Sequence, residues 1–337
     1  MTRRLQSGKI PISVLDRTVL RLTGAPSPYV VTPPRAGLDF AAVRLSRGYM
    51  IISADPITGV TPRIGEYAIK VSANDVATSG NRPQFAESVI LLPEGSSEDS
   101  VSEIASEMDG AARELGMAIV GGHTEVTPGL TRPIVVVTVI AFAERYVSSM
   151  NAGPGDTIMM TKTAGIEGTA VLASASGHMG LPSETVSGAK RLLRSLSIVD
   201  EAVAANRTGL VHGMHDCTEG GLLGAVYEMS LASGLGFELC EDKVPLAPET
   251  SVICRKFSVD PLRLIGSGSL LLAVERGGER RVEKALASVC RVTTVGEFNR
   301  GRRILVKKGG AREVVKDAPE DELWRLLARV PRGRRRL

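Results

Sequence analysis

Turn residues gather near the middle of the chain, in the stretch Asn151-Ala-Gly-Pro-Gly-Asp156. A strand-like apolar pattern starts again directly after it, over residues 157–160. A chain of 337 residues is also longer than one ordinary hydrophobic core requires, and it suits two domains of roughly 150 residues each. We therefore predict two domains, over residues 1–150 and 151–337.

Helix and strand patterns alternate in the first of these domains. Residues 98–117 follow a Ser-Ser cap and place apolar side chains three or four positions apart, which predicts an amphipathic helix. Residues 118–120 are typical of a short buried strand that enters a Gly-Gly turn. Residues 134–141 predict a β-branched strand that is apolar on both faces. The first domain is therefore expected to be α/β.

The second domain shows the same kind of alternation, and we expect a second α/β core there. The patterns predict strands near residues 157–161, 236–240, 269–275, 291–298 and 303–307, and helices near 167–176, 184–206, 219–232 and 278–289.

The composition argues against several classes of partner. Basic and acidic residues nearly balance, at 41 against 37, and aromatic residues are only 4%, so no nucleic-acid partner is expected. No apolar run reaches the length of about 18 residues that a membrane span needs, so no membrane partner is expected either. The four cysteines stand too far apart for a metal motif, and we expect free thiols in a reducing cytoplasm. We interpret the Arg-rich C-terminal tail as a solvated terminus.

Three aspartates stand beside small residues at the edges of apolar segments: Asp39, Asp55 and Asp75. No Lys or Arg occurs over residues 71–81, so Asp75 has no basic neighbour in sequence. Carboxylates gathered in one place repel one another unless a divalent cation neutralises them. The pattern indicates a Mg²⁺ site, with unrelated turn and cap residues as the alternative.

A second motif is Gly121-Gly122-His123-Thr124-Glu125. The two glycines would let backbone amides approach an anion, Thr124 can donate a hydroxyl, and His123 and Glu125 can position phosphate or metal. We predict a turn that handles phosphate, although a lone Gly-Gly turn is also common without one.

A third motif covers residues 215–222, from His215 to Leu222. Asp216 or Thr218 would cap the following helix, while Gly220 and Gly221 would open the positive N-terminus of that helix to an anion. Lys162 could also meet a phosphate, although a lysine there is more often solvated. His212 and His215 lack a third ligand at suitable spacing, so we do not predict them as metal ligands.

Taken together, these stretches resemble the ATP-dependent superfamily that includes aminoimidazole ribonucleotide (AIR) synthetase, selenophosphate synthetase, thiamine monophosphate kinase and the hydrogenase maturation factor HypE. Residues 37–43, Gly-Leu-Asp-Phe-Ala-Ala-Val, look like the family's Gly-Asp-Asp-Ala-Ala-Val turn, with Phe40 in place of its second Asp. Asp55-Pro56 and residues 74–77 stand at its next two acidic motifs, and residues 216–222 are similar to Asp-Pro-Thr-Arg-Gly-Gly-Leu of HypE.

The resemblance implies an α/β fold of two AIR synthase-like domains, the first binding ATP and metal and the second carrying the Arg-rich tail. It implies a homodimer in which the N-terminal sheets of two subunits form a shared β-barrel, with ATP between the domains and Mg²⁺ bridging its phosphates. The site residues it implies are Asp75, His123 and Asp216 for catalysis, Asn74, Gly121, Gly122, Thr124, Lys162, Gly220 and Gly221 for the cofactor, and Asp39, Asp55, Asp75 and Glu125 for the metal.

Three departures from the family patterns bear on the reaction. HypE uses a C-terminal cysteine to carry the group that is dehydrated, and here no cysteine follows Cys290. His123 stands where HypE and thiamine monophosphate kinase have Asp, and the N-terminal Cys or Sec of selenophosphate synthetase is missing. We expect a HypE-like enzyme that uses Mg²⁺-ATP to phosphorylate an amide, carboxylate or thiocarboxylate oxygen on a small-molecule or protein-borne acceptor. The alternatives are a small-molecule kinase and a non-catalytic ATP-binding maturation factor.

Overall fold

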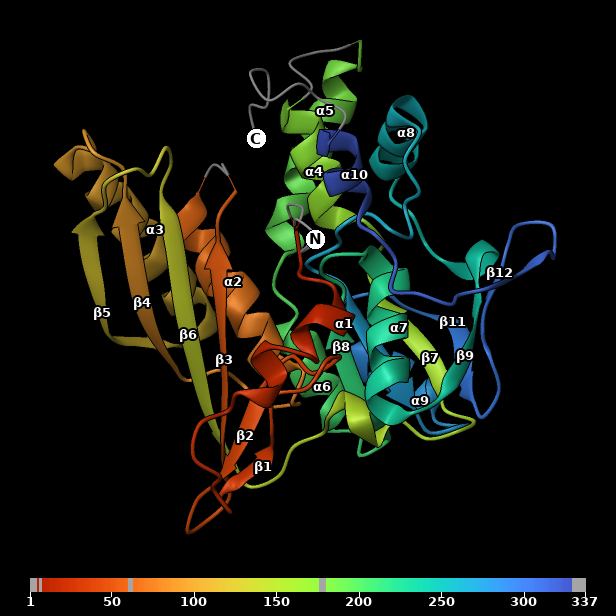
Figure 1. Cartoon of the computed structure of the whole chain (residues 1–337). Helices are drawn as coiled ribbons and strands as arrows, with labels where there is room; N and C mark the ends of the chain where they lie inside the picture. The colour runs from red at the N-terminus through yellow and green to blue at the C-terminus, as the bar shows by residue number, and fades with distance from the viewer. Residues whose placement is uncertain (1–4, 6–7, 60–62, 176–179, 329–337) are drawn as a thin grey trace.

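The computed structural model describes residue 5 and residues 8–59, 63–175 and 180–328 (Figure 1). The Arg-rich tail of the sequence analysis lies outside these described residues.

The first half of the chain forms a six-stranded mixed sheet with the order β1-β2-β3-β6-β4-β5. Only β4 and β5 run parallel, and the other neighbours are antiparallel. Helices α2 and α3 lie together against one face of this sheet (Figure 1). The elements are β1 (Val30–Thr32), β2 (Ala41–Arg44), β3 (Tyr49–Ile57), α2 (Ile64–Ala77), β4 (Phe85–Leu92), α3 (Glu98–Leu115), β5 (Ala118–Val126) and β6 (Ile134–Ala143), preceded by the short α1 (Ile12–Leu15).

The second half forms a seven-stranded mixed sheet with the order β13-β12-β9-β11-β7-β10-β8. Its strands are β7 (Thr157–Thr161), β8 (Val211–Asp216), β9 (Gly236–Cys240), β10 (Leu270–Val274), β11 (Val292–Asn299), β12 (Arg303–Val306) and β13 (Arg312–Val314). Its helices are α4 (Ile166–Ala175), α5 (Ser183–Leu192), α6 (Val199–Asn206), α7 (Gly221–Ser233), α8 (Pro248–Phe257), α9 (Glu279–Leu286) and α10 (Glu322–Ala328).

Strands β7 and β10 of the second sheet are buried on both faces, and strand alternation divides their side chains between two cores. Met159 of β7 packs into a core with α6 and α9, whereas Ile158 and Met160 pack into a core with α7. The first of these cores continues through α2 into the first sheet, because Ile69 and Val137 belong to the same cluster as Met159. The two halves therefore share one hydrophobic core at their junction.

Most of the predicted elements are confirmed. The predicted helix over 98–117 is α3, with Ser97 accepting a hydrogen bond from the Ser100 amide and Gly116 in the left-handed region at φ 72°. All five strands that the sequence predicts in the second half are present. Strands β8 and β13 and helices α8 and α10 were not predicted.

One element prediction in the first half is wrong. The predicted short strand and Gly-Gly turn at 118–122 form instead one strand, β5, that continues to Val126 and is exposed along its whole length. A β-bulge at the pairing of Ala86 and Glu87 with β5 accommodates the extra residue. The strand predicted over residues 134–141 is confirmed as β6, and one of its faces is buried: Val135, Val137, Val139 and Ala141 are buried while the residues between them are partly exposed.

The single helix predicted over 184–206 is also wrong, because the chain breaks between α5 and α6. At this break, backbone groups of Ser195, Leu196, Ser197 and Ile198 bind side chains from elsewhere in the fold. Those groups could not do so inside a continuous helix, where carbonyls and amides bind one another.

Candidate functional site

Helix α2 and strand β3 bring two of the predicted aspartates together. Asp75 lies near the end of α2, and Ser53 on β3 donates a hydrogen bond of 2.7 Å from its hydroxyl to Asp75 Oδ2. Asp55, two residues further along β3, forms a side-chain hydrogen bond with Asp75. Burial raises the pKa of Asp75 well above its ordinary value, and the charges of Asp55, Asp216 and Asp39 raise it further. Burial likewise raises the pKa of Asp55.

The third aspartate meets the second domain. Asp39 lies two residues before the start of β2, and its Oδ1 is 3.2 Å from Nδ1 of His215 on β8. The same nitrogen is 3.8 Å from Oδ1 of Asp216, the last residue of β8. Burial raises the pKa of Asp39 to about 7, with His215 opposing the rise and Asp216 adding to it. Asp39, Asp55, Asp75 and Asp216 thus converge at the junction of the two domains.

This group of four carboxylates has the features of a cation site. Oδ2 of Asp39 and Oδ2 of Asp216 are buried and have no hydrogen-bond partner among the residues that the structure describes. Buried carboxylate oxygens without a donor are costly unless a cation or a proton neutralises them. Mg²⁺ prefers oxygen ligands from carboxylates and phosphates. The residues present therefore fit a divalent cation.

His215 is a site residue that the sequence analysis set aside. It is almost fully buried, its Nδ1 lies 2.8 Å from the main-chain oxygen of Asp216, and its Nε2 is 3.2 Å from Glu228 Oε2 on α7. One ligand atom each from Asp39, His215 and Asp216 lie within 4.8 Å of one another. Burial works to raise the pKa of Glu228, but Lys9 and His215 outweigh it and lower that pKa to about 2. His212, by contrast, pairs with Asp156 at 2.9 Å.

Glu167 on α4 adds a further acid to the second-domain side. Burial raises its pKa to about 7, against a hydrogen bond from Ser267, and the charges of Asp321, Glu219 and Asp216 raise it further. Neither Glu167 nor Lys9 could be predicted as a site residue from the sequence, because both lie outside the three motifs.

Within a single chain, the motif at residues 121–125 lies away from the four aspartates. His123 pairs with Val89 across β5 and β4, Val89 pairs with Val136 on β6, and Val136 pairs with Pro56 on β3. Three strand spacings therefore separate His123 from the Asp55 region, roughly 14 Å. His123 and Glu125 are exposed and contact each other at 3.2 Å. The neighbouring Gly121, Gly122 and Thr124 lie on the same exposed strand.

Two residues that were predicted to bind the cofactor, Asn74 and Lys162, instead form hydrogen bonds with backbone groups at the domain junction. Asn74 is fully buried, donates from Nδ2 to the Leu196 carbonyl at 2.8 Å, and accepts at Oδ1 from the Ile198 amide at 2.9 Å. The ammonium of Lys162 donates to the carbonyls of Ser195, Ser197 and Gly268 at 3.0, 2.7 and 2.9 Å, and also pairs with Glu201. A phosphate could reach these groups only by displacing their present partners.

The glycines before α7 are closely packed. Gly220 has φ 82° and donates its amide to Asp321 Oδ2 at 2.8 Å, so a carboxylate already occupies the N-terminal end of this helix. Gly221 has φ 62°, and a Cβ there would lie 2.6 Å from the Leu264 carbonyl oxygen. The two glycines therefore allow the backbone before α7 to pack closely against neighbouring residues. This packing places Asp216 and Thr218 beside α7.

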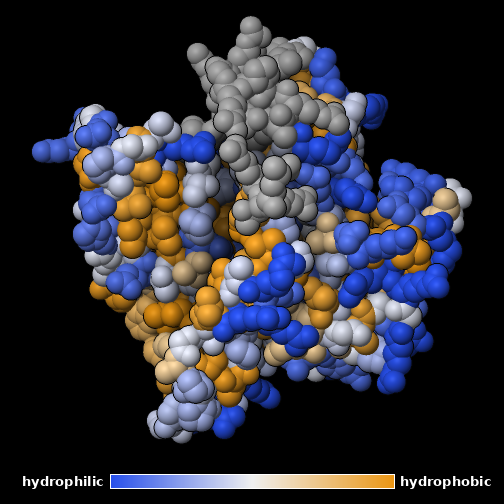
Figure 2. Space-filling model, viewed as in Figure 1, coloured by the Kyte–Doolittle hydropathy of each residue, from blue (hydrophilic) through white to orange (hydrophobic). Residues whose placement is uncertain are grey.

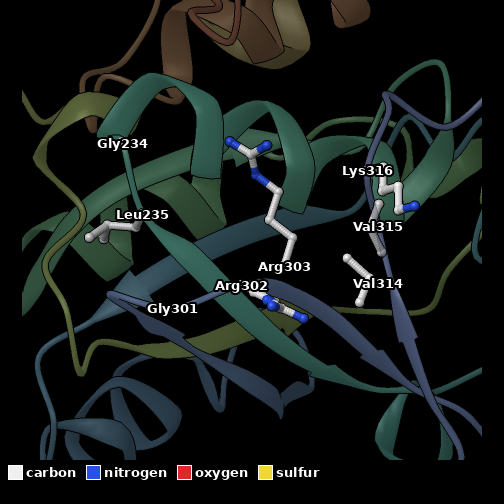
Figure 3. Close-up of a pocket in the computed structure, with 8 residues that line it drawn as sticks. All are labelled: Gly234, Leu235, Gly301, Arg302, Arg303, Val314, Val315 and Lys316. Atoms are coloured by element: carbon white, nitrogen blue, oxygen red, sulfur yellow. The ribbon is translucent and has the colours of Figure 1, made fainter.

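A surface pocket lies away from this acidic site, near the end of α7 and strands β12 and β13 (Figure 3). Its basic side chains include Arg303, which donates to Ser230 at 2.7 Å and stands 4.8 Å over the ring of Tyr227. None of the motif residues lines it. Among the described helices, none is long and apolar enough to cross a membrane.

Comparisons with known proteins match both halves of the chain. Residues 37–143 match the family model of the AIR synthase related protein, N-terminal domain, and residues 153–308 match that of its C-terminal domain. A carbamoyl dehydratase HypE of Cupriavidus necator is 30% identical over 250 residues, covering 70% of this chain and 69% of that protein. A putative hydrogenase expression/formation protein of Methanocaldococcus jannaschii is 28% identical, covering 65% of this chain and 64% of that protein.

Solved structures agree in fold. HypE in a HypE-HypF complex has a TM-score of 0.76 at 23% identity, covering 90% of this chain and 99% of that chain. HypE in complex with ATP has a TM-score of 0.71 at 22% identity, covering 95% and 98%. A ThiL protein complexed with AMPPCP and TMP has a TM-score of 0.72 at 18% identity, covering 92% and 95%.

Proposed function

Because the chain belongs to the AIR synthase-related family, we propose that it is a Mg²⁺-ATP-dependent enzyme that phosphorylates an amide, carboxylate or thiocarboxylate oxygen. The observation that carries this proposal is the convergence of Asp39, Asp55, Asp75 and Asp216 from two domains. Within the described part of the chain, one buried oxygen each of Asp39 and Asp216 has no hydrogen-bond partner. Such a set suits the metal ions that accompany ATP phosphates.

The roles follow from where each carboxylate lies. Asp39, Asp55 and Asp75 would hold Mg²⁺ from the first domain, and Asp216 would approach from the second. Bound Mg²⁺ would neutralise charge on the phosphates as the γ-phosphoryl group moves. The protein itself would position the reactants, and its aspartates would exchange the protons that they hold in the absence of metal for the bound cation. Catalysis of this kind depends on geometry and charge rather than on a covalent intermediate.

A second copy of the chain is part of this proposal. The outer face of the first sheet and its edge strand β5 carry apolar side chains, and Figure 2 shows them as orange atoms over the sheet at the left of the view. Ile119, Val120 and Val126 on β5 are 40%, 62% and 53% exposed. An exposed apolar edge strand readily pairs with another strand. A homodimer through these sheets would cover them, and it is the arrangement in which His123 and Glu125 could meet an active site.

The test is nucleotide binding and turnover by the purified protein with and without Mg²⁺, comparing wild type with Asp75→Asn and separating ADP from AMP. Mg²⁺-dependent ATP binding with slow ADP formation, reduced at least about 100-fold in Asp75→Asn, supports phosphoryl transfer. AMP as the product would contradict transfer of the γ-phosphoryl group. ATP binding without turnover in either protein, under acceptor screening, would favour a non-catalytic ATP-binding factor. Absence of binding would overturn the ATP site.

A further inference from the structure

Strand β13 forms one edge of the seven-stranded sheet. In the described part of the chain it pairs only with β12, and its outer side has no neighbouring strand. The Val314 side chain is 40% exposed on this edge, whereas Val315 beside it is buried. Figure 3 shows Val314, Val315 and Lys316 in succession along the strand. An open edge of this kind is a place where a further strand can be added.

The hydrogen bonds between β12 and β13 show which backbone groups point outward. The Val315 amide donates to the Arg303 carbonyl at 2.9 Å, so these two residues form a hydrogen-bonded pair. Antiparallel pairs alternate between bonded and non-bonded, so the next pair, Val314 with Ile304, is non-bonded. The amide and the carbonyl of Val314 therefore face the open side, where they can bind an added strand.

The hairpin that carries this edge is strongly basic. Residues 300–316 contain one acidic residue, Glu313, which pairs with Arg263 at 3.5 Å. They contain seven basic residues: Arg300, Arg302, Arg303, Lys307, Lys308, Arg312 and Lys316. Lys307 pairs with Glu241 and Arg312 with Glu238, and the other five form no ion pair with a described residue. This excess of positive charge suits an anionic partner.

The order of side chains along the edge specifies the partner further. Arg312 and Lys316 stand two positions before and after Val314, so the three side chains share one face of the strand. Residues of an added strand that lie directly opposite them would share that face. The complementary pattern is therefore an acid, an apolar residue and an acid at alternate positions. A pocket of about 450 Å³ at the end of this edge, lined in part by Val314, Lys316 and Arg302, has room for a side chain of that strand.

Charge argues against occupants from the same protein. Residues 329–337 lie outside the described residues and hold five arginines and no acid, so the basic hairpin would repel them. A second copy paired edge to edge through β13 would bring two basic hairpins together. Nucleic acid would suit the charge, but its backbone offers no partner for the outward amide and carbonyl of Val314 in the manner of a strand.

We propose that the open edge of β13 docks an extended acidic segment of a partner protein, which joins the sheet as an added strand. An apolar residue of that segment lies opposite Val314, with carboxylates beside Arg312 and Lys316. Backbone hydrogen bonds supply affinity, and the charges select the partner. This surface is separate from the acidic site at the domain junction, so the proposal is independent of the proposed function.

Calorimetric titration of the full-length protein with the capped peptide Glu-Thr-Val-Thr-Glu tests the backbone contact first. We expect Val314→Pro to weaken binding at least about fivefold, because proline removes the outward amide without breaking a hydrogen bond to β12. Val314→Thr keeps that amide and a branched side chain, so it should bind within about twofold of wild type. The same peptide with an N-methyl group on its valine should bind the wild type at least about fivefold more weakly.

The charge contact is tested in the same titration. Lys316→Glu should weaken binding of the acidic peptide about fivefold, and the matched control Lys190→Glu, at an exposed lysine on α5, should change it less than about twofold. The peptide Lys-Thr-Val-Thr-Lys should not bind. Matching thermal unfolding curves show that a loss of binding does not come from misfolding. If Val314→Pro unfolds, the N-methylated peptide and Lys316→Glu still decide the proposal.

Four outcomes would overturn the proposal. The first is absence of binding by the wild type at millimolar concentrations of the acidic peptide. The second is equal binding of the acidic and basic peptides. The third is a short oligothymidylate that binds more tightly than the acidic peptide to both wild type and Val314→Pro, which would assign the hairpin to nucleic acid. The fourth is a wild-type dimer that Val314→Pro converts to monomer, which would assign the edge to a second copy.

Discussion

Asn74 and Asp75 are neighbours on helix α2 but bind opposite halves of the molecule. The Asn74 amide binds the backbone of Leu196 and Ile198 in the second domain, while the Asp75 carboxylate accepts the hydroxyl of Ser53 in the first. The pair sets both the rotation and the axial position of α2 at the junction. Any change in how the domains meet would therefore move Asp75 within the acidic site.

Asn74→Ala should destabilise the protein strongly. The substitution removes two buried hydrogen bonds and leaves the Leu196 carbonyl and the Ile198 amide without partners. Each unsatisfied buried group costs about 1–3 kcal/mol, so for the two groups we expect a loss of about 2–6 kcal/mol in the free energy of unfolding. Urea denaturation measures it, with Asn151→Ala as an exposed control. A loss below about 1 kcal/mol would show that the contact does not hold the domains together.

Stability without metal should fall as the pH rises from about 4 to about 7. Asp39 and Glu167 have pKa values raised from 3.8 and 4.5 to about 7, so the folded state keeps protons that the unfolded chain has already lost. The raised pKa values favour the folded state fully only below the unfolded values, and their contribution is lost by about pH 7. Thermal unfolding in EDTA from pH 4 to 8 tests this.

Mg²⁺ should reverse part of that loss. A cation that binds the ionised aspartates stabilises the folded state by mass action, and it competes with protons at low pH. We expect millimolar Mg²⁺ to raise the melting temperature more at pH 8 than at pH 5. An equal rise at both pH values would mean that the ion does not bind these carboxylates.

Lys162→Met should act on stability rather than on nucleotide affinity alone. The ammonium binds three carbonyls and Glu201, which is almost fully buried, so its removal leaves a buried acid without its cation. Breaking such a pair typically costs about 3–5 kcal/mol. Denaturant titration against Lys190→Met measures the difference. A variant of unchanged stability that has lost ATP binding would instead favour the phosphate-binding role that the sequence predicts.

Val120→Lys should weaken self-association. Val120 lies on the exposed edge strand β5, and a lysine there blocks pairing of edge strands without affecting the core of one chain. Light scattering after size-exclusion chromatography should show a dimer for the wild type and a shift toward monomer for the variant. Val289→Lys, at an exposed valine in the second half, is the matched control. A wild-type monomer at micromolar concentration would contradict the proposed dimer.

Local patterns in the sequence were sufficient for α3 and for most strands of the second sheet, because apolar spacing and caps depend on residues that are close in sequence. They failed at β5, where Gly121 and Gly122 indicate a turn. There the pairing with β4 decides the outcome, and a Cβ on Gly122 would lie only 2.1 Å from the Ser88 carbonyl oxygen. They failed again between α5 and α6, where the partners Asn74 and Lys162 are distant in sequence.

The residues of the acidic site also fall into two groups: those that the sequence indicates and those that only the tertiary structure brings together. Asp39, Asp55, Asp75 and Asp216 could be proposed from the sequence, because acids among small residues at strand and helix ends have few local partners and a plausible chemistry. Which other groups join them was decided by tertiary structure alone. Lys9 meets Glu219 across 210 residues of chain, and His215 meets Asp39 only where β8 ends beside β2. The burial and the charge of groups at such a junction depend on how the two domains pack against each other. That packing cannot be predicted from the spacing of residues along the chain.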